Sequence, residues 1–87
     1  MTHAQLTQWQ AIKDKYPDVI ILMRYTDDYL AVNEDADKVS ALLQTEMRAN
    51  EHRQIRITWV TPLQLTEGLK KLIAAGNRVA IVDPLIS

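Results

Sequence analysis

The sequence contains no cysteine, only two glycines and no long apolar run. Without cysteine the chain can form neither a disulfide framework nor a thiolate metal site. Gly68 and Gly76 are too few for a glycine-rich loop that cradles phosphates, which excludes nucleotide hydrolysis. The longest apolar run, Val19 to Met23, is too short to cross a bilayer. We therefore expect a soluble, cytoplasmic protein without a membrane partner.

The length and the composition predict one folded domain over residues 1–87. A chain of 87 residues closes at most one hydrophobic core, which excludes a two-domain enzyme. Apolar residues make up 47% and charged residues 24%, which is close to the globular norm, so wholesale disorder is also excluded.

The net charge of −1 hides an uneven distribution of charge along the chain. Residues 1–47 contain four basic and eight acidic residues, whereas residues 48–78 contain six basic and two acidic residues. Charges scattered over solvated faces explain this pattern, and so does a basic face that meets phosphate.

Apolar residues at helical spacing predict three helices, over residues 3–16, 34–48 and 62–75. Thr2 has capping-box spacing at the first helix, and Thr61 followed by proline marks the start of the third. We expect Asn33 to cap the second helix, with Met47 on its buried face. Gly68 in the third helix indicates either close packing or simple tolerance.

Short β-branched runs predict four strands, over residues 19–23, 29–32, 55–60 and 78–82. The continuous run Val19–Met23 is typical of a central strand covered on both faces. The polar turn Thr26–Asp28 joins it to the next strand as a β-hairpin. In the third strand, Ile57 and Trp59 alternate with a wetter face that includes Thr58. The order α-β-β-α-β-α-β predicts an α+β domain with a small mixed sheet and three helices.

No set of residues in the sequence indicates catalysis. His3 and His52 belong to no ligand cluster or nucleophile set, and a surface role explains both. The densest carboxylate group lacks the spacing of a calcium loop, and it consists of Asp27, Asp28, Glu34, Asp35 and Asp37. Turn chemistry and helix N-terminal charge explain these acids. We expect no enzyme activity, metal, cofactor or small-molecule substrate.

The aromatic residues divide into core and contact candidates. Trp9 lies on the apolar face of the first helix, and Trp59 shares strand parity with Ile57, so both are expected in the core. Tyr25 and Tyr29 flank the hairpin turn and are the better candidates for contact with a partner.

Four strings in the same order resemble a known family. They are Ile12-Lys13-x-Lys15-Tyr16-Pro17-Asp18, Ile21-Leu22-Met23-Arg24-x-x-Asp27-x-Tyr29, Glu34-Asp35-Ala36 and Leu69-x-x-Leu72-Ile73-x-Ala75-Gly76-x-Arg78-Val79-Ala80-Ile81. Together they are similar to the N-terminal mismatch-recognition domain, domain I, of the DNA mismatch repair protein MutS. The resemblance covers about residues 8–83 and implies that fold. In that family the domain reads a mispaired base, while separate domains supply the ATPase.

The resemblance also implies that the family's sensor is altered. The family string Gly-Asp-Phe-Tyr-Glu wedges a phenylalanine against the mispaired base and hydrogen-bonds the base with the glutamate. This chain has Thr26-Asp27-Asp28-Tyr29-Leu30, so Asp28 replaces the phenylalanine and Leu30 replaces the glutamate. An aspartate has no ring to stack and carries the same charge as the phosphates. We therefore expect a degenerate motif without mismatch preference.

Two hypotheses follow. The first is a stand-alone, non-catalytic module that binds DNA or another nucleic acid electrostatically, and its candidate contacts are Arg53, Arg56, Lys70, Lys71 and Arg78. The second is a protein-interaction module with no nucleic-acid role, in which the hairpin or a sheet edge docks onto another protein or a second copy.

Overall fold

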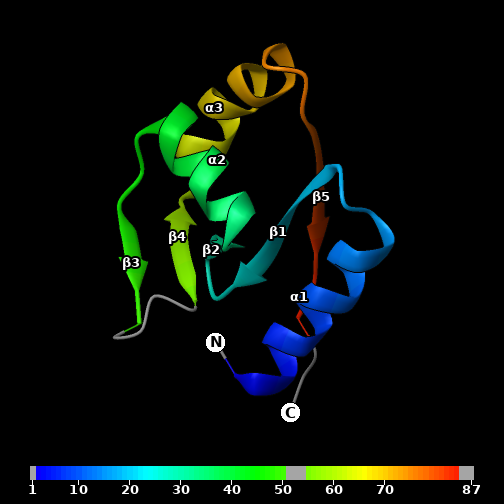
Figure 1. Ribbon diagram of the computed structural model, residues 1–87. Coiled ribbons are helices and arrows are strands. Elements are labelled where there is room, and N and C mark those ends of the chain that lie inside the picture. Colours follow the sequence, from blue (N-terminus) through cyan, green and yellow to red (C-terminus); the bar gives the residue numbers. More distant parts are fainter. Residues whose placement is uncertain (1, 51–54, 85–87) are drawn as a thin grey trace.

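The computed structural model describes residues 2–50 and 55–84, which form three helices and a five-stranded sheet (Figure 1). The helices are α1 (His3–Lys15), α2 (Glu34–Leu43) and α3 (Pro62–Ala74). The strands are β1 (Val19–Tyr25), β2 (Asp28–Val32), β3 (Met47–Ala49), β4 (Arg56–Val60) and β5 (Arg78–Val82). The predicted α+β class and the hairpin β1–β2 are confirmed. None of the helices in these two ranges is long and apolar enough to span a membrane.

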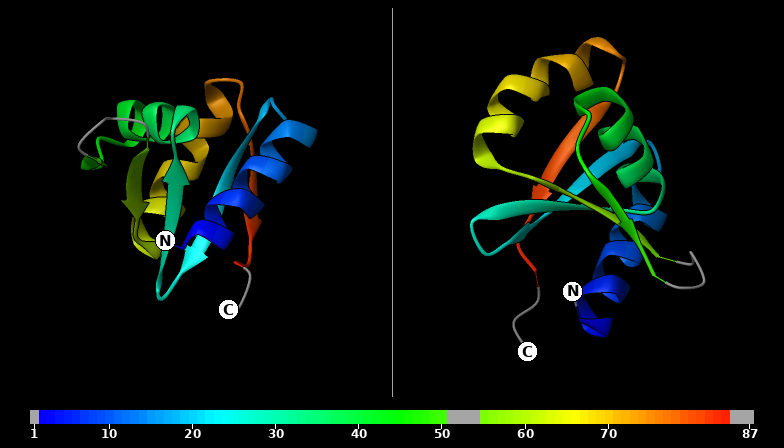
Figure 2. Two further views of the ribbon diagram at one scale, coloured as in Figure 1. Left: turned by 60° about the horizontal axis from the view of Figure 1, so that its bottom comes forward. Right: turned by 90° about the vertical axis from the view of Figure 1, so that its left-hand side faces the viewer.

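The sheet has the strand order β3-β4-β2-β1-β5, with β5 parallel to β1 and the other pairs antiparallel. Helices α2 and α3 cover one face, and α1 lies across the other (Figure 2). Strand β1 supplies both layers of the core: Ile20 and Leu22 pack under α2 and α3, whereas Ile21 and Met23 pack under α1. The expectation of a central strand covered on both faces is confirmed.

Two helices begin where their capping residues predict. Thr2 Oγ1 accepts a hydrogen bond from Gln5 N at 3.1 Å, and Gln5 Oε1 accepts one from Thr2 N at 2.9 Å. Thr61 and Gln64 repeat this reciprocal pair at the start of α3. Each capping box satisfies backbone donors that the first helical turn would otherwise leave unpaired.

The second helix is shorter than predicted, and its capping residue has another role. It ends at Leu43 because Gln44 adopts a left-handed conformation with φ of 58°. The apolar Met47 belongs to the short edge strand β3, which the sequence pattern did not predict. Asn33 makes no side-chain cap, and its Oδ1 accepts a hydrogen bond from Arg56 N at 2.9 Å. A side-chain amide that can cap a helix can equally join that helix to a strand.

The two faces of β4 are also buried differently than predicted. Thr58 and Val60 are fully buried on the face of α2 and α3, although Thr58 was expected on the wetter face. The hydroxyl of Thr58 is satisfied by Glu46 O at 2.6 Å. Ile57 and Trp59 are only half-buried, since they pack at the margin of the α1-side core. Trp9 in α1 is fully buried, as predicted.

Gly68 is a position of close packing between α2 and α3. A Cβ atom at this residue would lie 2.4 Å from Leu43 Cδ2 and 2.5 Å from Leu43 Cγ. Real Cβ atoms do not approach other atoms that closely, so any larger residue would displace Leu43. Packing of the Leu43 side chain directly over Gly68 therefore favours the close-packing interpretation of this glycine.

A buried ion pair joins α1, β1 and α2. Lys13 Nζ donates to Asp35 Oδ1 at 2.6 Å and to Val19 O at 2.7 Å, and Asp35 Oδ2 accepts from Ile21 N at 3.0 Å. Strands β1 and β2 pair only over three residues next to the turn and then diverge (Figure 2). The carboxylate therefore satisfies a β1 amide beyond the paired part of the hairpin.

We expect Lys13→Met to lower the free energy of unfolding by about 3 to 5 kcal/mol, because it leaves the Asp35 carboxylate buried without its cation. The free energy is measured by urea denaturation. Lys15→Met on the exposed side of the same helix is the control and should change it by less than about 0.5 kcal/mol. Equal effects of the two variants would contradict this role for the ion pair.

Candidate nucleic-acid interface

The hairpin turn carries the residues that the sequence resemblance aligns with the family's sensor string. Tyr25 pairs with Asp28, so Thr26 and Asp27 form a two-residue connection. Thr26 has φ of 53°, and its hydroxyl donates to Tyr25 O at 2.7 Å. A positive φ at the first turn position is the geometry of a type II′ hairpin, in which glycine is favoured. Threonine is β-branched and is strained in this conformation.

The three positions that follow the turn have very different exposure. Asp28 is half-buried at the start of β2, close to the turn. Tyr29 is also half-buried and packs against the core under α2 and α3, with the guanidinium carbon of Arg24 5.9 Å from its ring centroid. Leu30 is only 2% exposed and belongs to the α1-side core together with Trp9. The side chain at position 30 is therefore closed off from any ligand.

Arg56 is engaged by a carboxylate within the chain. Its Nε and Nη2 donate to the two oxygens of Asp37 at 2.9 and 2.8 Å. These hydrogen bonds raise the pKa of Arg56 above its ordinary value, and the negative charges of Asp37 and Glu34 add to this. A phosphate would have to compete with Asp37 for this guanidinium. Arg53 lies outside the described residues.

Three of the predicted cations lie on α3 and β5. Lys70 and Lys71 are in the second half of α3, and Arg78 begins β5 after a short turn in which Gly76 has φ of 88°. All three are exposed, and none forms an ion pair with another residue in the described parts of the chain. Arg56 begins β4 far from this end of α3 (Figures 1 and 2). Of the four described candidates, Lys70, Lys71 and Arg78 thus belong to the end of α3 and to β5, whereas Arg56 belongs to the start of β4.

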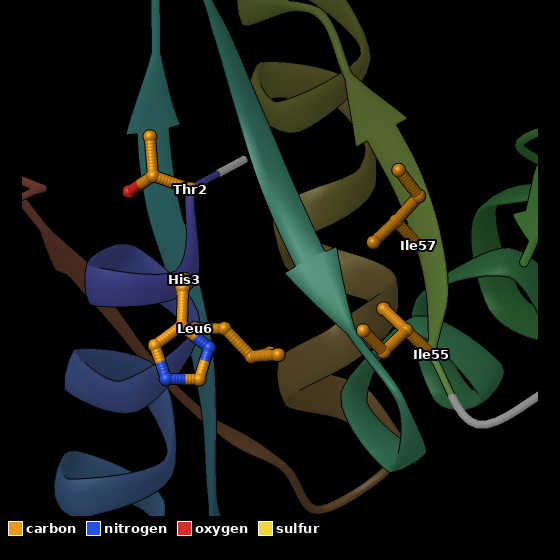
Figure 3. Close-up of a pocket in the computed structure, with 5 residues that line it drawn as sticks. All are labelled: Thr2, His3, Leu6, Ile55 and Ile57. Carbon is orange, nitrogen blue, oxygen red and sulfur yellow. The ribbon is translucent and has the colours of Figure 1, made fainter.

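Sequence reasoning missed a second surface, beside α1. A cleft of about 370 Å³ lies between the start of α1 and β4, and Leu6 faces Ile55 and Ile57 across it (Figure 3). His3 and Thr2 complete its lining. Strand alternation marks the isoleucines as one face, but it does not show that α1 leaves part of that face uncovered.

Trp59 continues the same strand face beyond the cleft. The guanidinium carbon of Arg48 from β3 lies 5.3 Å from the ring centroid of Trp59. No signal in the sequence links these two residues, because the link depends on the unpredicted strand β3. Within residues 2–50 and 55–84, no group of three or more potential metal-ligating side chains comes together.

The fold and the site together define a class of protein: an α+β domain with a two-residue hairpin beside a buried central strand. A family model described as MutS domain I matches residues 3–85, and the chain belongs to this family.

Curated relatives agree with this assignment. The DNA mismatch repair protein MutS of Christiangramia forsetii is 37% identical over 82 residues, which cover 92% of this chain and 9% of that protein. The MutS proteins of Syntrophobacter fumaroxidans and Pseudothermotoga lettingae are 35% and 40% identical, and each match covers 90% of this chain and 9% of the relative. The chain thus spans only a small part of the length of these relatives.

We expect Thr26→Gly to raise the free energy of unfolding by about 0.5 to 1 kcal/mol, because glycine adopts the positive φ without strain. The matched control is Asp27→Gly at the adjacent position, which lacks a positive φ and should lose stability instead. Thermal and urea denaturation measure both changes. Loss of stability in Thr26→Gly would show that the turn has a different conformation.

Leu30→Glu should lower the free energy of unfolding by about 3 to 5 kcal/mol, because it places a carboxyl in the apolar core. Burial raises the pKa of such a carboxyl, so the folded state keeps it protonated while the unfolded state ionises. The difference in the free energy of unfolding between Leu30→Glu and the parent chain should therefore be larger at pH 7 than at pH 4. A stable Leu30→Glu variant would place position 30 at the surface and contradict the structure.

Proposed function

We propose that this chain is a MutS domain I module that binds nucleic acid through phosphates, without preference for a mispaired base. The observation that carries the proposal is the state of the two sensor positions. Position 28 has an acidic side chain beside the hairpin turn, and position 30 has a leucine inside the core.

The missing preference follows from the chemistry of these two positions. Stacking of an aromatic ring on a base is worth about 1 to 3 kcal/mol, and Asp28 has no ring to provide it. Its carboxylate adds repulsion from the phosphates. The Leu30 side chain has no hydrogen-bonding group and is buried. The chain therefore lacks both of the contacts through which, by the family resemblance, a mispaired base would be distinguished from a paired one.

The remaining contacts are electrostatic. Lys70, Lys71 and Arg78 are exposed and form no ion pair with described residues, so they are available to phosphate oxygens. Arg56 contributes less because Asp37 holds it. Arg53 stays part of the proposed set on its charge alone. Contacts of this kind position a nucleic acid but do not read its sequence.

A protein-interaction module without a nucleic-acid role is the second candidate. The hairpin that would approach DNA in this family carries Asp27 and Asp28, and Tyr25 beside them is exposed. An acidic tip with an exposed aromatic ring suits a protein surface better than a polyanion.

Fluorescence anisotropy with labelled DNA tests the proposal. We expect equal affinity for a homoduplex and a G·T-mismatched duplex, and weaker binding as salt rises. If three phosphate contacts are made, affinity for duplex should fall by about 40-fold between 50 and 200 mM salt. Combined Lys70→Gln, Lys71→Gln and Arg78→Gln should remove most of this dependence. Lys38→Gln, an exposed lysine in the acidic half of the chain, is the control.

Two results would contradict the proposal. Binding of neither duplex nor single-stranded DNA below high micromolar concentration at low salt would favour the protein-interaction module. A clear preference for the mismatched duplex would show that Asp28 and Leu30 do not abolish recognition.

A further inference from the structure

Strand β5 forms an open edge of the sheet. It pairs with β1 through Val19–Met23 on one side, and no described residue pairs with it on the other. The middle of the strand, Val79-Ala80-Ile81, contains no charge, and Ile81 is 47% exposed. Natural edge strands are blunted by inward charges, proline or short length. The opposite edge strand, β3, has only three residues, one of them Arg48.

An apolar flank of α3 lies on the same side of the molecule as this edge. Leu65 and Leu72 of α3 enter the core, and Gly68 faces Leu43 of α2. With 3.6 residues per turn, Leu69 and Ile73 fall on the flank that points away from α2. They are 36% and 57% exposed. Because α3 packs against β5 as well as α2, this flank lies toward the β5 half of the sheet.

We propose that β5 pairs antiparallel with β5 of a second copy of this chain, in a register centred on Ala80. In this register Val79 of each copy lies opposite the partner's Ile81, so the exposed Ile81 side chain of each copy gains a β-branched neighbour. Arg78 lies opposite the partner's Val82, and Asp83 lies opposite the partner's Asn77. No like charges are opposed in this arrangement.

The apolar flank explains why the occupant is a second copy. Antiparallel self-pairing places a two-fold axis perpendicular to the sheet, so the α3 face of one copy continues as the α3 face of the other. The two α3 helices then lie side by side above the joined strands, where Leu69 and Ile73 of each copy are covered. A stable dimer buries about 800 Å² on each partner. A strand of five residues, about 17 Å long, presents less than this alone, so the helix flank has to take part.

Self-association is measured by sedimentation equilibrium from about 1 μM to about 1 mM protein. The mass should rise toward twice the monomer mass of 10.0 kDa. Ile81→Lys should raise the dissociation constant at least about tenfold, because it places a charge in the joined strands. Leu63→Lys is the matched control: Leu63 is 66% exposed on α3 but lies away from the flank, so association should not change.

Disulfide trapping tests the register. The chain has no cysteine, so a single substitution gives an unambiguous cross-link. Directly opposed residues in an antiparallel pair have Cα atoms about 4.5 to 5.5 Å apart, within the range of a disulfide. Oxidised Ala80→Cys should therefore form a covalent dimer, whereas Arg78→Cys, with its counterpart four residues along the partner strand, should not.

Several outcomes would overturn the proposal. If the chain stays monomeric at every concentration, β5 does not pair with a second copy and is open to a different protein. If Leu63→Lys weakens the dimer as much as Ile81→Lys does, the dimer forms through another surface. Cross-linking of Arg78→Cys without Ala80→Cys would exclude the register centred on Ala80. These results are independent of DNA binding, so the nucleic-acid proposal can fail while this one stands.

Discussion

The fold depends on one buried interaction, the ion pair between Lys13 and Asp35. It occupies the place where β1 and β2 stop pairing, so the β1 backbone on that side needs partners from elsewhere. Asp35 accepts the Ile21 amide, and Lys13 donates to the Val19 carbonyl. Helix α1, strand β1 and helix α2 are thereby held at one point. Both charged residues lie in the strings that carry the family resemblance, which gives part of that resemblance a structural reason.

A buried ion pair is weak evidence of high stability, because removing two charges from water costs much of what their attraction returns. The main effect of this ion pair is to fix how α1, β1 and α2 are placed relative to one another. Both oxygens of Asp35 accept hydrogen bonds and Lys13 donates two, so this relative placement of α1, β1 and α2 leaves neither charge unpaired. That placement orients the hairpin. The ion pair does not involve positions 28 and 30, the two positions that the family resemblance aligns with the sensor.

The sequence predicts elements wherever one local signal decides the outcome, as at the two capping boxes and the central strand. It fails where tertiary contacts decide. Met47 has helical spacing, yet Gln44 ends the helix and Met47 pairs in a sheet. Asn33 is predicted as a cap, but its side chain binds the Arg56 amide, which is distant in sequence. The pairing of Arg56 with Asp37 likewise has no signal in the sequence. That Asp28 and Leu30 replace the family's sensor residues stays a prediction from the sequence resemblance. The burial of Leu30 is not evident from the sequence, because it depends on how α1 crosses the sheet.

Hydrogen exchange at the Ile21 amide tests the role of the ion pair most directly. This amide donates to the Asp35 carboxylate, so its protection reports whether that contact persists in solution. If the ion pair holds α1, β1 and α2 together, the Ile21 amide should exchange only through global unfolding, at the same free energy as the best-protected amides of β1. Exchange through local opening, at a free energy well below that of its β1 neighbours, would contradict the account.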